Sequence, residues 1–271
     1  MPTASINGVD LHYERHGDSG PPLVLVHGYT GDITDWRYQI AEFSPTHRLL
    51  VFDLRGHGRS QAPHDRAAYG ILQMADDVEA LAARAGFARY HLLGHSMGGA
   101  IVQEIALRSP ARLLSLTLED TSFRFGLARD GAIAQWIAER HKMAEEQGMA
   151  AVADFPAVLP PPPHMPPERL DETKQRLTRM SVDAFVGAWQ ALDAWPGTED
   201  RLGAISAPTL VICGELDVAL VGPAKTLAAA IPGATLEIIP ECGHSPQYER
   251  PDLFNAAVRR HLERNAAAAA K

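Results

Sequence analysis

The sequence is poor in cysteine, lacks long apolar runs and carries no excess of basic residues. Only two of the 271 residues are cysteines, Cys213 and Cys242, which excludes a disulfide framework and matches no metal-ligand spacing. No apolar run approaches the roughly 18 residues that a membrane-spanning helix needs. The 25 Lys and Arg against 33 Asp and Glu give a formal net charge of −8, and no basic cluster suits nucleic acid. We therefore expect a small-molecule partner, with no nucleic acid and no membrane.

The length and the N-terminal residues narrow the class of protein further. A chain of 271 residues suits one large α/β domain that carries an insertion. The N-terminal stretch "MPTASINGVDLHYERHG" has no basic start followed by an apolar core, so it does not resemble a secretory signal. We expect a cytoplasmic protein.

Short apolar runs alternate with amphipathic segments of helical length. A first pair of alternating segments surrounds Asn7-Gly8, which predicts a hairpin with a type I′ turn. The later runs, bounded by Gly, Pro or Asp, are typical of strands buried on both faces: "PLVLVHG", "RLLVFDL", "YHLLGHS", "LLSLTLED", "TLVICGELD" and "TLEIIPECGH". Helices are expected between them, at residues 34–43, 70–86, 97–108, 222–231 and 250–264. This order predicts a doubly wound, mostly parallel sheet.

The alternation stops after Asp120. Residues 122–200 contain no convincing strand. They hold only helical stretches, "AIAQWIAERHKMAEE", "RLDETKQRLTRMS" and "VDAFVGAWQALDAW", which are split by the proline-rich "FPAVLPPPPHMPP". We interpret residues 122–200 as a helical cap, inserted into a core domain that comprises residues 1–121 and 201–271.

A serine flanked by glycines lies where a predicted strand meets a predicted helix. The pattern Gly-x-Ser-x-Gly spans Gly94 to Gly98, and Ser96 is its serine. A turn this tight favours neighbours without a Cβ, and it lifts the hydroxyl clear of the backbone. The N-terminus of the following helix favours the negative charge that develops when a serine attacks a carbonyl. The pattern indicates that Ser96 is a nucleophile.

A serine nucleophile needs a base and a carboxylate that orients the base. In α/β enzymes of this kind the chain order is Ser, then Asp or Glu, then His. After Ser96, Asp217 ends one predicted strand and His244 follows the last one. All three lie at the carboxyl ends of strands, which is where such sheets bind their ligands. Asp120 occupies an equivalent place after the preceding strand, so chain order alone leaves two candidates for the acid.

With these motifs the whole chain resembles an α/β-hydrolase with a helical cap. The resemblance implies an eight-stranded sheet and favours Asp217 as the acid, because Gly-Glu-Leu-Asp matches the commoner family pattern. It also implies that the backbone amides of Tyr29, in "VHGYTGD", and of Met97 form the oxyanion hole. From "DLRGHGRS" we expect Asp53 and Arg55 to brace loops, and we expect His27 to hold the loop beside it.

The resemblance further suggests the substrate and the residues that bind it. The cap is rich in aromatic residues, so we expect a small hydrophobic substrate. The residues that we expect to line its pocket are Gly28, His95, Trp136, Trp189 and Val218. No phosphate loop, dinucleotide pattern or zinc motif is present, and we expect no cofactor and no metal.

The predicted activity is that of a serine esterase similar to a carboxylesterase, which acts through an acyl-enzyme. The same triad also serves lactonases, perhydrolases and hydrolases of carbon–carbon bonds of the meta-cleavage type, and these remain alternatives. A serine at the nucleophile position excludes haloalkane dehalogenases and epoxide hydrolases, which use an aspartate there. A receptor that resembles a hydrolase and binds its ligand under the cap is the alternative outside enzymes.

Overall fold

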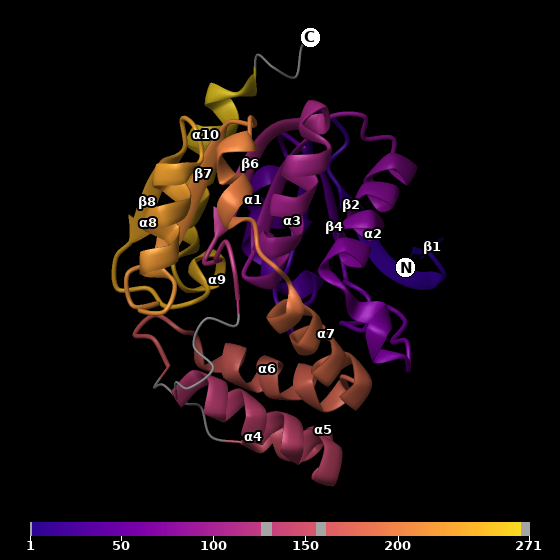
Figure 1. The fold of residues 1–271 in the computed structure, drawn as a ribbon. Coiled ribbons are helices and arrows are strands. Elements are labelled where there is room, and N and C mark those ends of the chain that lie inside the picture. Colours follow the sequence, from indigo (N-terminus) through magenta and orange to yellow (C-terminus); the bar gives the residue numbers. More distant parts are fainter. Residues whose placement is uncertain (1, 126–131, 156–160, 267–271) are drawn as a thin grey trace.

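The computed structural model describes residues 2–125, 132–155 and 161–266. Its described residues form one sheet of eight strands in the order β1-β2-β4-β3-β5-β6-β7-β8. Helices cover both faces of this sheet, and a separate group of helices lies at one end of it (Figure 1). The predicted fold class, a doubly wound and mostly parallel α/β sheet with inserted helices, is confirmed.

The sheet begins with an antiparallel pair and continues in parallel. Strands β1 (Thr3–Ile6) and β2 (Val9–His16) are joined by a turn with positive φ at Asn7 (48°) and Gly8 (78°), as the Asn-Gly pair predicts. Strand β2 then pairs antiparallel with β4. The parallel strands are β3 (Pro22–Val26), β4 (Arg48–Phe52), β5 (Tyr90–His95), β6 (Leu113–Glu119), β7 (Thr209–Gly214) and β8 (Thr235–Ile239).

Each face of the sheet packs against its own helices. Side chains of α2 (Ile71–Arg84), α3 (Met97–Arg108) and α8 (Val221–Ala230) share one apolar cluster. Those of α1 (Arg37–Phe43) and α10 (Pro251–Arg264) share the other. Neighbouring side chains of β3 alternate between the two clusters, and this double burial explains the continuous apolar runs of the sequence.

Shorter helical turns complete the connections of the sheet domain. They are η1 (Ile33–Trp36), η2 (Arg66–Tyr69), η3 (Pro110–Arg112), η4 (Glu199–Ala204) and α9 (Pro246–Glu249). Among the described residues, no helix combines the length and the apolar character that crossing a bilayer requires.

In the described residues between β6 and β7, four α-helices are present and are called the inserted helices below: α4 (Ala132–Gln147), α5 (Met149–Asp154), α6 (Pro167–Arg179) and α7 (Val182–Ala194). The sequence predicted α4, α6 and α7 but not the short α5. Their side chains form a small apolar cluster of their own. These helices lie together beside one end of the sheet (Figure 1). The cap boundaries at residues 122 and 200 remain a prediction, and residues 126–131 and 156–160 of that range lie outside the described residues.

Buried ion pairs fasten the inserted helices to the loop that follows β3. Arg169 and Arg176, both on α6, donate hydrogen bonds to Asp35, the latter at 2.7 Å. Arg176 also lies 3.4 Å from Asp32. Burial tends to raise the pKa of Asp35, but the two arginines outweigh it and lower the pKa far below its ordinary value. These ion pairs therefore hold the loop that carries Tyr29 against α6.

Candidate active site

Ser96 lies in a strained turn between β5 and α3. Its φ of 54° and ψ of −117° belong to a region that residues with a Cβ rarely adopt. The backbone on either side holds this conformation: the Ser96 N–H donates to the carbonyl of Glu119 (2.9 Å), and its own carbonyl accepts from Gly99 (2.8 Å). The same carbonyl accepts from Oγ1 of Thr121 at 2.7 Å. Thr121 is a residue of the site that the sequence analysis missed.

The glycines around Ser96 are required by close backbone contacts. A Cβ on Gly94 would lie 2.4 Å from the carbonyl oxygen of Gly98, and a Cβ on Gly98 would lie 2.3 Å from that of Val26. Both distances are far shorter than a carbon–oxygen contact allows. The Gly-x-Ser-x-Gly pattern therefore lets α3 start directly against β3 and β5, with the Ser96 side chain at the turn.

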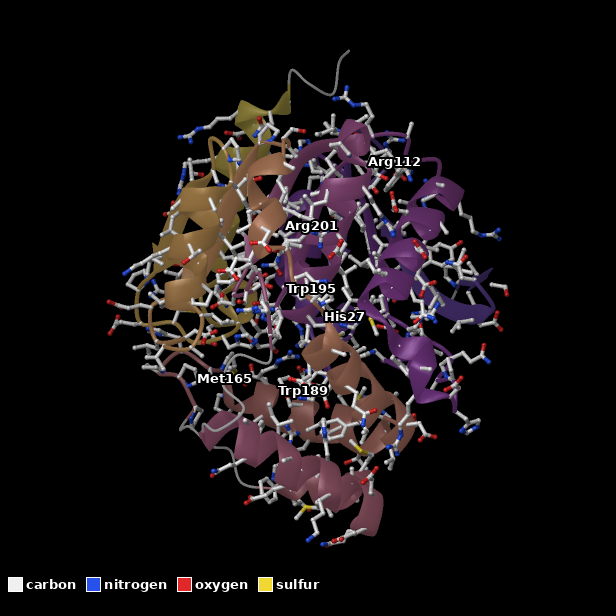
Figure 2. All side chains as sticks on the ribbon, in the orientation of Figure 1. His27, Arg112, Met165, Trp189, Trp195 and Arg201 are labelled. Atoms are coloured by element: carbon white, nitrogen blue, oxygen red, sulfur yellow. The ribbon has the colours of Figure 1, made fainter. Side chains whose placement is uncertain are left out.

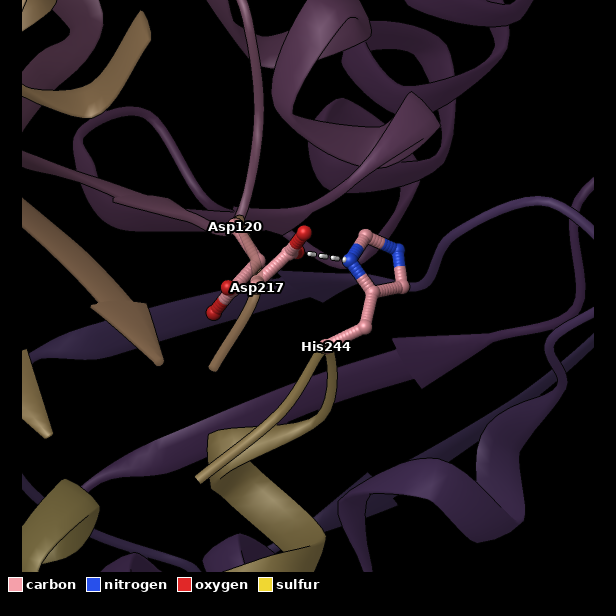
Figure 3. Close-up of side chains that lie close together, drawn as sticks. All are labelled: Asp120, Asp217 and His244. Atoms are coloured by element: carbon pink, nitrogen blue, oxygen red, sulfur yellow. Dashed lines mark hydrogen bonds and ion pairs between the residues drawn. The ribbon is translucent and has the colours of Figure 1, made fainter. Parts of the chain in front are cut away.

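His244 connects Ser96 to Asp217. Its Nε2 lies 3.1 Å from Oγ of Ser96, and its Nδ1 lies 2.5 Å from Oδ2 of Asp217 (Figure 3). Because the Asp217 carboxylate can only accept, Nδ1–H is the donor, and in the neutral ring Nε2 is left to accept the Ser96 hydroxyl proton. The structure thus brings Ser96 and His244 together with Asp217, which is the acid that the family resemblance favoured.

The loop that carries His244 is held by two buried side chains. Glu249, on α9, accepts hydrogen bonds from the amides of Gly243 (2.6 Å) and Ser245 (3.0 Å). His95, which was expected to line the pocket, instead donates from Nε2 to the carbonyl of His244 at 2.7 Å. Burial, and then the charge of His244, lower the pKa of His95 to about 3, so its ring is neutral. Apart from its proximity to His244, nothing in the chain's pattern singles out Glu249.

The charges of His244 and Asp217 stabilise each other. Burial tends to lower the pKa of His244, but the charge and hydrogen bond of Asp217 outweigh it and raise the pKa to about 9. Conversely, burial tends to raise the pKa of Asp217, and His244 more than reverses this, so the carboxylate is ionised. The Asp217 side chain is 10% exposed and that of His244 is 48% exposed, so the imidazole reaches solvent.

Asp120, the second candidate for the acid, lies beside Asp217 (Figure 3). One ligand atom from each of Asp120, Asp217 and His244 lies within 4.8 Å of the others, and the imidazole makes its hydrogen bond to Asp217. Among the described residues these three side chains are the one group close enough to share a metal ion. Both nitrogens of His244 are already engaged with Asp217 and Ser96.

Tyr29 and Met97, whose amides were expected to form an oxyanion hole, follow β3 and β5 on the two segments next to Ser96. Met97 is the first residue of α3, and Tyr29 follows β3 in a turn closed by Gly28 and Gly31. Neither amide donates to another described residue. Gly28 packs so closely on the nucleophile that a Cβ there would lie 3.0 Å from Cβ of Ser96. Both free N–H groups are thus on the two segments that border Ser96.

The Tyr29 side chain extends into the inserted helices. Its hydroxyl donates to the carbonyl of Phe185 at 2.7 Å, and its ring lies 5.4 Å from the rings of Phe185 and Trp189. Trp189 lies on the side of these helices that faces the sheet domain (Figure 2). Of the remaining residues expected to line the pocket, Val218 is 77% exposed beside Asp217. Trp136 lies on α4, where its ring contacts the Arg140 guanidinium.

Arg140 is a buried cation above Tyr29 that the sequence analysis missed. Its guanidinium lies over the rings of Trp136 (4.2 Å) and Phe185 (5.2 Å). Within the described part of the chain no carboxylate pairs with it, and its Nε has no hydrogen-bond partner. Burial lowers its pKa, and Tyr29 partly opposes this. No pattern in the sequence marks this arginine, because its surroundings depend on how α4 and α7 pack.

The residues expected to brace loops do so. His27 accepts the amide of Leu54 at 3.0 Å, and Asp53 accepts the amide of Ile33 at 2.8 Å. The Nε of Arg55 donates to the carboxylate of Asp77, on α2, at 2.7 Å. These contacts hold the loop that leads to Tyr29 against the loop that follows β4.

Comparisons with known proteins identify a matching family model and several similar proteins. Residues 21–251 match the family model described as alpha/beta hydrolase fold. A putative carbamate hydrolase, RutD, from Azorhizobium caulinodans is 31% identical, over 94% of this chain and 96% of the relative. The crystal structure of the enol-lactonase from Burkholderia xenovorans LB400 is similar with a TM-score of 0.85 and 31% identity, over 97% of this chain and 100% of that one. A thermophilic esterase from Thermogutta terrifontis is similar with a TM-score of 0.83 and 28% identity, over 98% of both chains.

Proposed function

Because the chain belongs to the α/β-hydrolase fold family, we propose that it is a serine hydrolase that cleaves a carboxylic ester of a small substrate through an acyl-enzyme. The observation that carries this proposal is the 3.1 Å distance between Nε2 of His244 and Oγ of Ser96, with Asp217 on the other ring nitrogen. In the proposal Ser96 is the nucleophile, His244 the base and Asp217 the residue that orients the base.

The reaction follows from these positions. His244 takes the proton of Ser96 through Nε2 while Oγ forms a bond to the carbonyl carbon of the ester. The amides of Tyr29 and Met97 donate to the resulting oxyanion, and one such donor is worth about 10²- to 10³-fold in turnover. The carbon–oxygen bond to the alcohol then breaks, and His244 returns the proton to that oxygen. Water, activated by His244, releases the acid from Ser96.

The rings above Tyr29 favour an apolar substrate of modest size. Phe185 and Trp189 present aromatic surface to the Tyr29 ring, and we propose that the inserted helices cap the site. The Arg140 guanidinium also lies over the Phe185 ring and would attract a negatively charged group at the far end of the acyl or alcohol part. The test compares kcat/KM for short esters with and without a terminal carboxylate, in wild type and in Arg140→Gln. The comparison measures how much the Arg140 charge contributes to the use of the charged esters.

The proposal is tested by turnover of p-nitrophenyl acetate and butyrate. We expect multiple turnovers with wild type and a loss of at least about 10⁴-fold in kcat for Ser96→Ala, since removing such a serine costs about 10⁶-fold. Ser206→Ala changes an exposed serine before β7 and serves as the matched control. A Ser96→Ala variant that is folded and keeps wild-type turnover would refute the proposal.

A second candidate is the hydrolysis of a lactone, an ester closed within one molecule. The 31% identity to the enol-lactonase structure favours it, and the proposed chemistry at Ser96 is the same. Lactones and open esters of equal carbon number, assayed side by side for kcat/KM, distinguish the two. A ratio above about tenfold in favour of lactones would assign the chain to lactone hydrolysis.

A further inference from the structure

Asp120 is a buried carboxyl group whose role the proposed reaction does not explain. It follows β6, is 0% exposed, and has a positive φ of 38°. Its Oδ1 accepts hydrogen bonds from the amide of Gly214 (3.0 Å) and from the Cys213 thiol (3.3 Å). Its Oδ2 is buried and accepts no hydrogen bond. One oxygen is therefore satisfied by donors, and the other is buried without a donor.

Two carboxyl groups and one imidazole occupy this corner of the site, with one ligand atom of each within 4.8 Å of the others. No Arg or Lys in the described part of the chain pairs with Asp120 or Asp217, so His244 is the one cation available to two acids. Two carboxylates this close do not both ionise, because their repulsion adds to the cost of burying charge. One of them must carry a proton.

The surroundings decide which acid carries that proton. Asp217 is partly exposed and bonds directly to the His244 ring, whereas Asp120 is fully buried. Burial, followed by the charge of Asp217, raises the pKa of Asp120 well above its ordinary value. Since Oδ1 already accepts from Gly214, the proton belongs on Oδ2.

We propose that Asp120 is a neutral carboxylic acid whose Oδ2–H donates to the Asp217 carboxylate, and that it thereby positions Asp217 against His244. The inference rests on the proposed function, because it assigns Asp217 to the orienting role. In this arrangement the pair holds one proton and one negative charge. Asp120 is a positioning residue, since it acts on the imidazole only through Asp217.

The other titratable groups around Asp120 leave this arrangement intact. They are Glu119 on β6, Cys213 on β7 and Cys242 in the loop before His244. Burial raises the pKa of the Glu119 carboxyl and of both thiols, so these groups are uncharged. The charges that face Asp120 are therefore those of Asp217 and His244.

The test is the pKa of His244, followed by NMR of its imidazole in wild type, Asp120→Asn and Asp217→Asn. In Asp120→Asn the amide side chain would keep both the acceptor for Gly214 and a donor to Asp217 without changing the charge. We therefore expect Asp120→Asn to leave the pKa of His244 within about half a pH unit, and Asp217→Asn to lower it clearly. If Asp120 were ionised, its replacement would remove a negative charge within 4.8 Å of the imidazole. The pKa of His244 would then fall by about two pH units, and this result would overturn the proposal.

A second comparison tests the positioning role. Asp120→Leu removes the donor to Asp217, so we expect its kcat to be at least tenfold below that of Asp120→Asn; equal values would contradict the role. Should the Leu variant fail to fold, infrared spectroscopy of wild type and Asp120→Asn decides instead. Because neutral Glu119 contributes a protonated-carboxyl band to both proteins, the difference between their spectra must show one such band lost in Asp120→Asn, and an unchanged band intensity overturns the proposal. The NMR and infrared results do not depend on turnover, so they separate this proposal from the esterase assay.

Discussion

The contact between α3 and β3 makes Gly98 a sensitive position for activity. In Gly98→Ala the new Cβ would lie 2.3 Å from the carbonyl oxygen of Val26 and 2.6 Å from that of His27. To restore a separation of 3.0 Å, the start of α3 has to move by about 0.7 Å, and both Ser96 and Met97 move with it. Overpacking of this kind costs about 1–3 kcal/mol, and a displacement of about 1 Å at reacting groups can cost 10²-fold in rate.

Gly222 supplies the matched control for this prediction. It also lies in a helix, α8, but a Cβ there meets nothing within 4 Å. Gly222→Ala is expected to be neutral or to stabilise by about 0.5–1 kcal/mol. The free energy of unfolding in urea and kcat on p-nitrophenyl butyrate are measured for both variants. If Gly98→Ala matched Gly222→Ala in both quantities, the argument from close packing at the nucleophile would be wrong.

Four further predictions concern the groups around the proposed base and the loops that support it. Because His244 must be neutral to accept a proton and its pKa is raised to about 9, kcat/KM should rise with pH up to about 9. Asp217→Asn should shift this rise to lower pH and reduce kcat by about 10⁴-fold; an unchanged profile would contradict the charge coupling. Glu249→Gln leaves one of the two amides beside His244 without its acceptor, so thermal unfolding should show a loss of about 1.5–3 kcal/mol and kcat should fall. Asp77→Asn weakens a bidentate pair with Arg55 whose side chains are 1% and 5% exposed, and urea unfolding should show a loss of up to about 3–5 kcal/mol; an unchanged midpoint would refute this.

Local patterns in the sequence were sufficient for the sheet and for the nucleophile turn. Strands buried on both faces are continuous apolar runs, and the glycines around Ser96 mark a contact that excludes any Cβ. The Asn7-Gly8 turn follows from backbone preferences of two residues alone. These features depend on short stretches of chain, so the chain reveals them without a structure.

The sequence pattern alone did not predict the contacts between segments that lie far apart in the chain. Asp120 and Asp217 both follow strands that end at the same edge, and only the distance to His244 shows which one it bonds. Pattern also did not predict that His95, an expected pocket residue, donates to the His244 carbonyl, because the loop after β8 passes beside it only in the folded chain. Arg140 lies over aromatic rings of α4 and α7, and the relative placement of those helices is a tertiary property.

The most direct test of the proposed chemistry is the site of acyl transfer. Wild type and Ser96→Ala are mixed with p-nitrophenyl butyrate, quenched in acid within one turnover and digested, and the peptides are weighed by mass spectrometry. The account predicts a butyryl group on the peptide that contains Ser96 in wild type and none on the corresponding peptide of the variant. A butyryl group on another residue that forms and decays at the rate of turnover would contradict it.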